Sequence, residues 1–95
     1  EGQSYAKACL IISDHPEAIG EAIMEKLERG VTSLQGKGMY TKQGKEVLMV
    51  IVSRLEIASI KRIVAEIDPR AFVIIHDVHE VLGEGFRGLE EAAGR

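Results

Sequence analysis

The side chains best suited to metal or acid-base chemistry stand in three short pairs. These are Asp14-His15, His76-Asp77 and His79-Glu80. His76 and His79 are three residues apart, and in a β-strand this spacing places two side chains on opposite faces. No paired cysteines and no HxxxH spacing accompany them. We therefore expect no metal site, and nothing in the chain indicates another cofactor.

Nucleophilic catalysis would need a nucleophile, a base and an orienting group within hydrogen-bond reach. Ser13 and Ser53 stand where helices are expected to begin, and hydroxyls there commonly cap the helix. Cys9 is the only cysteine and lies within an apolar run, so we expect a buried, unreactive thiol and no internal disulfide. The sequence thus predicts no catalytic residue and a protein that is not an enzyme.

Two glycine pairs are better candidates for a binding site. They occur in Gly36-Lys37-Gly38 and Gly83-Glu84-Gly85. Glycine lets a backbone approach a ligand closely, and exposed amides in such a loop can cradle an anion. Ser53-Arg54 adds amides at a helix start together with a cation. Two alternatives remain, a bulge or kink in a strand at Gly36 and Gly38, and a helix capping box at Ser53.

The composition limits the class of partner. The 12 basic and 15 acidic residues are interspersed and give a net charge of -3, and the chain has no Trp, two Tyr and two Phe. Neither charge nor aromatic content favours nucleic acid as a partner. The longest apolar stretches, 47–52 and 71–75, are far shorter than the ~20 residues that span a bilayer. We expect the chain itself to be soluble.

The elements that must position these residues follow from apolar periodicity. Strands are predicted over 5–12, 31–40, 46–52 and 71–77, with a polar turn at 42–45. A helix is predicted over 16–29, with Asp14 and Glu17 as a capping box and Gly30 as a left-handed C-terminal cap. A second helix is predicted to begin with the capping box Ser53-Glu56 and to end before Asp68-Pro69.

The order βαββαβ in a chain of this size predicts an α+β, ferredoxin-like sandwich, an antiparallel four-stranded sheet with both helices on one face. We expect residues 1–4 to be a linker or expression remnant, 5–80 to be the domain, and 81–95 to be a glycine-containing tail. The start at Glu1 is interpreted as a cut from a longer protein.

The strands are apolar on both faces, although helices can cover only one. The first strand, for example, carries Leu10 and Ile12 on one side and Cys9 and Ile11 on the other. Self-association through the open sheet face is the preferred interpretation. The tail or a region outside this sequence is the alternative cover.

Charge also gathers at two places. Lys37, Lys42 and Lys45 make a basic hairpin tip, while the acidic tail carries Glu80, Glu84, Glu90 and Glu91. Both are interpreted as solvated surfaces, or alternatively as surfaces that pair between neighbouring subunits.

Several short segments resemble, in the same order, the C-terminal domain of YitT-type bacterial membrane proteins. They are Ile11-Ile12-Ser13-Asp14, Arg29-Gly30-Val31-Thr32, Gly36-Lys37-Gly38-Met39-Tyr40, Val52-Ser53-Arg54, Lys61-Arg62-Ile63-Val64, Ile67-Asp68-Pro69, Ala71-Phe72-Val73-Ile74 and Glu80-Val81-Leu82-Gly83-Glu84-Gly85-Phe86. The resemblance implies a module attached to transmembrane helices on the cytoplasmic side of the bacterial inner membrane. That family has no known function. At the level of fold the chain is similar to the PII-like and ACT-like sensors, although its predicted turn is shorter than a PII loop.

These observations predict a non-enzymatic, oligomeric regulatory domain that senses a small anionic metabolite or nucleotide near a subunit interface. The alternative is a purely structural oligomerisation module that assembles the membrane protein. The predicted ligand-binding residues are Gly36, Gly38, Tyr40, Ser53, Arg54, Gly83, Gly85 and Phe86.

Overall fold

The computed structural model describes residues 6–83, 85–86 and 88–94 of the chain. The predicted remnant at residues 1–4 lies outside the described residues, as does Glu84 of the acidic tail. The elements follow the predicted order and comprise β1 (Ala6–Ile12), α1 (Pro16–Leu27), β2 (Thr32–Lys37), β3 (Gly44–Ser53), η1 (Arg54–Glu56), α2 (Ile57–Ile67), β4 (Phe72–Asp77) and α3 (Leu89–Ala92).

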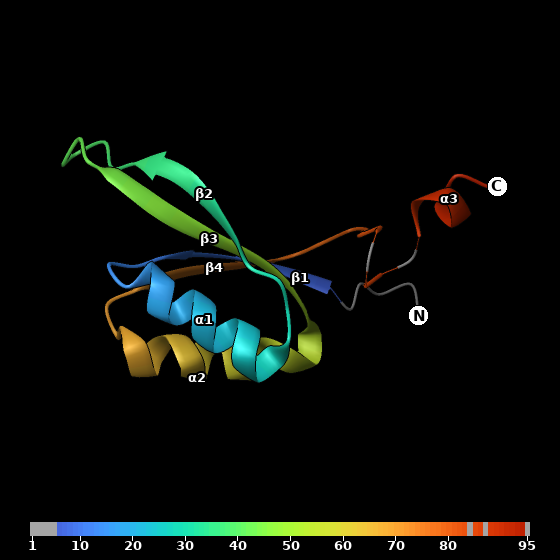
Figure 1. Ribbon diagram of the computed structural model, residues 1–95, viewed down its shortest axis with the longest axis horizontal. Helices are drawn as coiled ribbons and strands as arrows, with labels where there is room; N and C mark the ends of the chain where they lie inside the picture. Colours follow the sequence, from blue (N-terminus) through green and yellow to red (C-terminus); the bar gives the residue numbers. More distant parts are fainter. Residues whose placement is uncertain (1–5, 84, 87, 95) are drawn as a thin grey trace.

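The four strands form one antiparallel sheet in the order β2-β3-β1-β4. Helices α1 and α2 pack side by side on one face of this sheet (Figure 1). This arrangement confirms the predicted ferredoxin-like sandwich. The short helix α3 was not predicted, and it lies apart from the sheet beyond the end of β4 (Figure 1).

The core lies between the sheet and the two helices. Alternate residues of β1 and β3 meet apolar side chains of α1 and α2, because successive side chains in a strand point to opposite faces. Cys9 is fully buried there, as predicted, and burial raises the pKa of its thiol. The buried apolar residues are Cys9, Ile11, Ile19, Ile23, Leu48, Val50, Val52, Ile60, Ile63 and Val64.

Both ends of α1 differ from the prediction. Pro16 occupies the first helical position, so His15 is the N-cap and makes no side-chain capping bond. The predicted capping box of Asp14 and Glu17 is therefore wrong, because Asp14 stands one residue too early. The helix ends at Leu27, and Glu28 rather than Gly30 takes the left-handed conformation, with φ of 56°.

The β2–β3 hairpin is regular. Residues Thr32 to Lys37 pair in unbroken register with Met49 to Gly44, so the bulge considered at Gly36 is not present. The second capping box is confirmed, with Ser53 and Glu56 bonding reciprocally at the start of η1.

The sheet face opposite the helices is apolar, as the alternation predicted. The pairing register aligns Leu10 with Met49 on one side and Ile74 on the other, and Ile12 with Val47 and Phe72. Phe72 and Ile74 remain 64% and 41% exposed. No described helix covers this open face (Figure 1). It carries Ala8, Leu10, Ile12, Leu34, Val47, Met49, Ile51, Phe72 and Ile74.

No helix within the described ranges is long and apolar enough to cross a membrane.

Candidate functional site

The predicted ligand-binding residues lie in two groups at opposite ends of β3. Gly36, Gly38 and Tyr40 belong to the hairpin, where Lys37 pairs with Gly44. Ser53 lies at the far end of β3, where it pairs with Ala6 of β1. Ten residues of β3 separate these ends, which corresponds to about 30 Å. The described part of the chain therefore does not bring the two groups together.

The hairpin glycines serve the shape of the loop. Gly36 lies inside the ladder, where a Cβ would be 3.4 Å from Val47 Cγ2. Gly38 donates its N–H to the Gln43 carbonyl at 2.9 Å. A Cβ on Gly38 would lie 2.8 Å from Thr41 Oγ1, closer than such contacts allow. The Gly38 amide is thus already engaged, which argues against an anion cradle at this residue.

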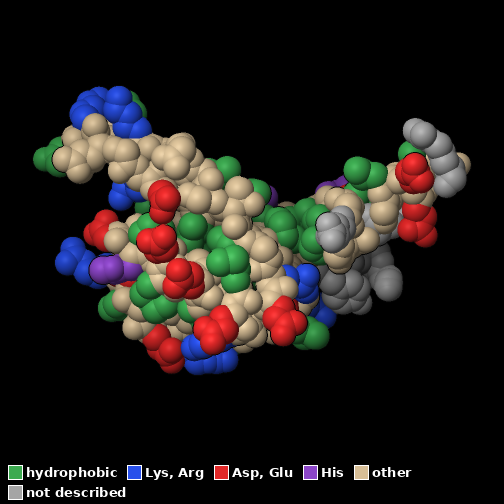
Figure 2. Space-filling model, in the orientation of Figure 1, with side chains coloured by type: hydrophobic (Ala, Val, Ile, Leu, Met, Phe, Trp, Pro, Cys, Tyr) green, Lys and Arg blue, Asp and Glu red, His purple; other side chains and the backbone are tan. Residues whose placement is uncertain are grey.

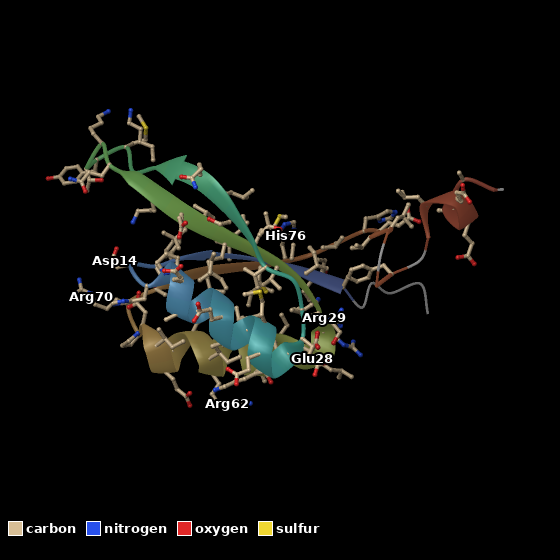
Figure 3. All side chains as sticks on the ribbon, viewed as in Figure 1. Asp14, Glu28, Arg29, Arg62, Arg70 and His76 are labelled. Carbon is tan, nitrogen blue, oxygen red and sulfur yellow. The ribbon has the colours of Figure 1, made fainter. Side chains whose placement is uncertain are left out.

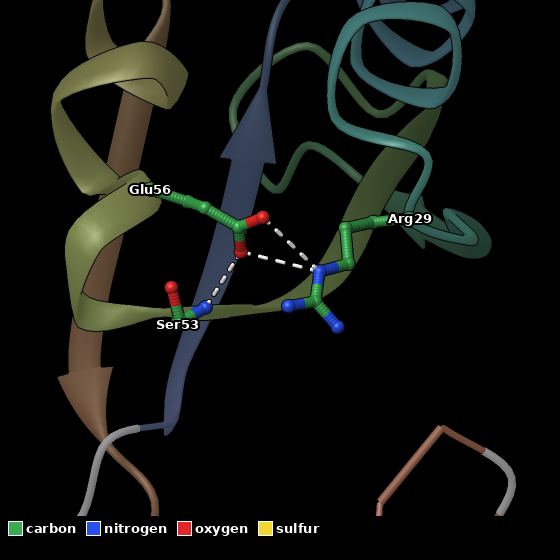
Figure 4. A network of polar contacts seen from close by, with 3 residues as sticks. All are labelled: Arg29, Ser53 and Glu56. Carbon is green, nitrogen blue, oxygen red and sulfur yellow. Dashed lines mark hydrogen bonds and ion pairs between the residues drawn. The ribbon is translucent and has the colours of Figure 1, made fainter.

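At the opposite end, the Glu56 carboxylate joins two segments (Figure 4). Its Oε1 accepts the Ser53 N–H at 2.8 Å and the Arg29 Nε–H at 3.1 Å. The Ser53 amide is therefore occupied within the capping box. Arg54 follows in η1 with an exposed side chain.

Arg29 is the residue of this end that the sequence did not single out as a site. Its guanidinium carbon lies 5.9 Å from the centre of the Phe86 ring, a cation-π distance. This contact joins Phe86 of the tail to the segment between α1 and β2. The available signal was a cation directly before Gly30, at the end of a predicted helix.

A cavity of about 480 Å³ opens beside this contact, and we call it the Arg29 cavity. One wall is apolar, and the others offer a guanidinium, a carboxylate, a hydroxyl and glycine backbone. Volumes of 300–1,000 Å³ are typical of small-molecule sites. It is lined by Glu28, Arg29, Gly30, Thr32, Met49, Ile51, Gly85 and Phe86.

Three of the predicted residues therefore meet at this end. Gly85 and Phe86 line the Arg29 cavity, and Ser53 lines an adjoining apolar hollow together with Arg29 and Phe86. Gly83 and Gly85 both have positive φ, 124° and 85°, as expected where the tail turns.

A second cavity, of about 410 Å³, lies at the other end of the sheet, near Asp14 and Arg70 in Figure 3. The buried Ser13 hydroxyl donates to Asp68 Oδ2 at 2.5 Å, and this bond is the main cause that lowers the pKa of Asp68. Lys45 and Arg70 bring positive charge, but Asp14 and Asp68 oppose it. The Arg29 cavity also pairs its cation, Arg29, with an acid, Glu28, so the difference between the two cavities is the larger apolar wall of the Arg29 cavity, formed by Met49, Ile51 and Phe86.

No group of three potential metal ligands gathers among the residues that the structure describes. The ring of His76 lies 3.1 Å from the carbonyl oxygen of its neighbour Asp77, which itself pairs with Lys7.

Comparison with known proteins assigns the chain to a protein family. Residues 29–83 match a family described as uncharacterized protein conserved in bacteria, DUF2179. The chain belongs to this family. The DUF2179 match includes Arg29, Gly30, Thr32, Met49 and Ile51 of the cavity.

Relatives in Bacillus subtilis confirm the resemblance to YitT-type proteins. The UPF0750 membrane protein YxkD is 44% identical over 86 residues, which cover 90% of this chain and 31% of YxkD. The UPF0750 membrane protein YitT is 34% identical over 74 residues, 78% of this chain and 26% of YitT. This DUF2179 chain thus spans less than a third of the length of either relative.

Two solved structures share the fold. A DUF2179 protein from Eubacterium ventriosum is 28% identical, with a TM-score of 0.67, covering 75% of this chain and 97% of that one. Arabidopsis thaliana PII bound to citrate is 18% identical, with a TM-score of 0.69, covering 93% of this chain and 92% of that one. The PII-like fold predicted from the sequence is confirmed.

Proposed function

We propose that this DUF2179 chain is a non-enzymatic sensing domain of a bacterial membrane protein, placed on the cytoplasmic side of the inner membrane. The names of its relatives support attachment to a membrane part, because YxkD and YitT are called membrane proteins and the matched residues cover only 31% and 26% of their lengths. The likeness to PII supports a regulatory domain over an enzyme, by analogy of fold.

The ligand that fits best is a small anion with an apolar or planar part. The arrangement of Arg29 supports this choice. Glu56 holds Arg29 through Nε, so the two terminal nitrogens of the guanidinium project away from the carboxylate (Figure 4). A guanidinium fork held in this way is suited to bidentate contact with a carboxylate or phosphate. Met49, Ile51 and Phe86 supply the apolar wall.

The site also adjoins the surface that we propose as the subunit interface. Thr32, Met49 and Ile51 line the Arg29 cavity, and their side chains belong to the open sheet face. A ligand in the cavity would therefore sit at the margin of a second subunit. This shared border is the single observation that carries the proposal of ligand sensing at an interface.

We propose that the occupant of the open face is a second copy of this chain. Phe72 and Ile74 are exposed in a row with Leu10 and Ile12, and burying such apolar area drives association. A purely structural assembly module would use the same face without a ligand. Light scattering that gives the monomer mass of 10.4 kDa at all concentrations would contradict self-association.

Thermal denaturation in the presence of a ligand panel tests the sensing proposal. The panel holds nucleotides, inorganic phosphate and small carboxylates including citrate. A ligand at 100 times its Kd should stabilise the fold by about 2.7 kcal/mol and raise the melting temperature. Failure of every compound would favour the purely structural module.

Matched variants locate the site. Arg29→Gln should abolish the ligand-induced rise, measured from the variant's own melting temperature, because the guanidinium that would bind the anion is removed. Arg70→Gln removes the same charge at the second cavity and should retain the rise. The reverse result would move the ligand to the second cavity. Arg54→Ala with an unchanged rise would remove Arg54 from the site.

A further inference from the structure

The loop between β2 and β3, residues 38–43, has a fixed shape, and we call it the hairpin tip. The Gly38 N–H donates to the Gln43 carbonyl at 2.9 Å, and the Lys42 N–H donates to the Gly38 carbonyl at 2.7 Å. Thr41 Oγ1 accepts the Gln43 N–H at 3.3 Å. These hydrogen bonds close the backbone of the tip, so the positions from which its side chains project are defined.

Those outward side chains are apolar. Tyr40 is 98% exposed and Met39 is 71% exposed, at the apex of a hairpin that projects from the body (Figure 1). Neither side chain contributes to the core or to any cavity described above. Packing among the described residues therefore does not explain why two large apolar side chains lie at this apex.

Positive charge surrounds this apex. Lys37 and Lys42 are exposed, and Figure 2 shows basic side chains gathered on the tip. From Lys37 to Lys45 the sequence contains no acidic residue, although acidic residues outnumber basic ones in the whole chain by 15 to 12. The tip therefore combines a local positive charge with an exposed apolar apex.

We infer that the hairpin tip binds the anionic surface of a lipid bilayer. Tyrosine has an apolar ring and a polar hydroxyl, and such side chains favour the level of the lipid headgroups. Methionine adds flexible apolar contact, while lysines near the surface are attracted by anionic lipids. The charges and the apolar apex lie on one projecting element, as this mode of binding requires.

The affinity of the tip for lipid can be low and the contact can still be populated. Each lysine near an anionic leaflet contributes about a fivefold gain in partitioning. The attachment to a membrane part, proposed above, would hold the tip at a high effective concentration near the lipid, where a weak contact is populated. The inference uses that attachment for proximity alone, and the tip is testable on the free chain.

Vesicle flotation of the chain provides the test. At low salt, the chain should float with vesicles containing about 30% phosphatidylglycerol in phosphatidylcholine and stay behind with pure phosphatidylcholine, and added salt should release it. Lys37→Gln with Lys42→Gln should lower partitioning roughly 30-fold. The matched control Lys61→Gln with Arg62→Gln removes two exposed cations from α2 and should bind as the natural chain does.

A tryptophan at the apex reports contact directly, because the chain contains no Trp. The emission of a Tyr40→Trp variant should shift to the blue when phosphatidylglycerol vesicles are added, as the ring leaves water. Leu55→Trp, at an 84% exposed position beyond the other end of β3, should not shift. Circular dichroism checks that each variant is folded.

Three outcomes would overturn the inference. They are no flotation with anionic vesicles at low salt, flotation unaffected by the double lysine variant, and equal spectral shifts at positions 40 and 55. Pairing of the tip with the acidic tail of a neighbouring copy would show itself as a change of mass in the double lysine variant without vesicle binding. Ligand-induced stabilisation through Arg29 is measured independently of each of these results.

Discussion

At the scale of single residues, two polar contacts tie together segments that are distant in the sequence. Ser13 and Asp68, which are 55 residues apart, link the loop after β1 to the loop before β4. Arg29 and Glu56, which are 27 apart, link the end of α1 to the start of η1. Both contacts hold the ends of helices against the sheet and so position the walls of the two cavities.

The contact of Asp68 predicts a dependence of stability on pH. The hydrogen bond from Ser13 lowers the pKa of Asp68 in the folded protein. A lowered folded pKa gives stability that is present above the unfolded pKa, about 3.9, and is lost as pH falls through the folded value. Asp68→Asn should therefore reduce the free energy of unfolding at neutral pH, and its deficit should shrink in acid.

Urea denaturation at a series of pH values measures this effect. Ser13→Ala is the matched control, because it keeps the carboxylate and removes the main cause of the lowered pKa. It should weaken the same pH dependence. Asp77 also has a lowered pKa, mainly because of its hydrogen bond with Lys7. Its contribution to the pH dependence should be the same in the natural chain, Asp68→Asn and Ser13→Ala. A deficit of Asp68→Asn that stays constant from neutral to acid pH would refute the assignment.

Residue-scale prediction from the sequence succeeded where the partners are close in the chain. The Ser53-Glu56 capping box has a local spacing and was predicted correctly. The contacts of Arg29 with Glu56 and Phe86 depend on how three separate segments fold, so no spacing in the sequence could reveal them. Gly85 and Phe86 were predicted as site residues, but Arg29, which gives the cavity its positive charge, was not.

At the scale of elements, apolar periodicity predicted three strands and both long helices, and the polar turn between residues 40 and 46 predicted β2 as one arm of a hairpin. Helix α1 shows how: Ile19 and Ile23 recur at four-residue spacing and are both fully buried against the sheet. The ends of α1 were predicted less well, because Pro16 and the left-handed Glu28 decide them rather than the periodic pattern. The four residues of α3 are too few to show a period.

The packing of α1 gives a prediction for this scale. Ile23→Ala should lower the free energy of unfolding by about 2–5 kcal/mol, because it leaves a cavity in a fully buried position. Its neighbour Met24 is 45% exposed, so Met24→Ala should cost much less. Denaturant unfolding measures both. Equal losses for the two variants would mean that α1 does not pack through the face described.

At the scale of the whole molecule, the layers of the sandwich are unequal. Helices α1 and α2 cover one face of the sheet, and within the described residues no helix covers the other, apolar face (Figure 1). Apolar side chains such as Phe72 and Ile74 therefore remain exposed on it. The alternation of apolar residues predicted both faces from the sequence. It could not predict what covers the second face. An apolar alternation indicates that a face is buried, but it is the same whether the cover is a second subunit or another segment.

A charge on the open face tests the proposed assembly. Ile74→Lys should lower the mass in light scattering toward the monomer while leaving the fold intact, because residue 74 is already 41% exposed and its new charge would be buried between subunits. Ala65→Lys, at an exposed position on α2, is the control and should leave the mass unchanged. An Ile74→Lys protein with unaltered mass would exclude this part of the face from the interface.

The buried thiol of Cys9 provides an internal probe for opening of the domain. It is the only cysteine, it is fully buried in the core, and burial raises the pKa of its thiol. An alkylating reagent can reach it only when the sandwich opens, so with reclosing faster than alkylation the rate of modification follows the population of the open state, without any added label. A bound ligand slows the modification by the factor with which it lowers the population of the open state. Binding at the Arg29 cavity would thus be registered by a sulfur atom in the core of the fold.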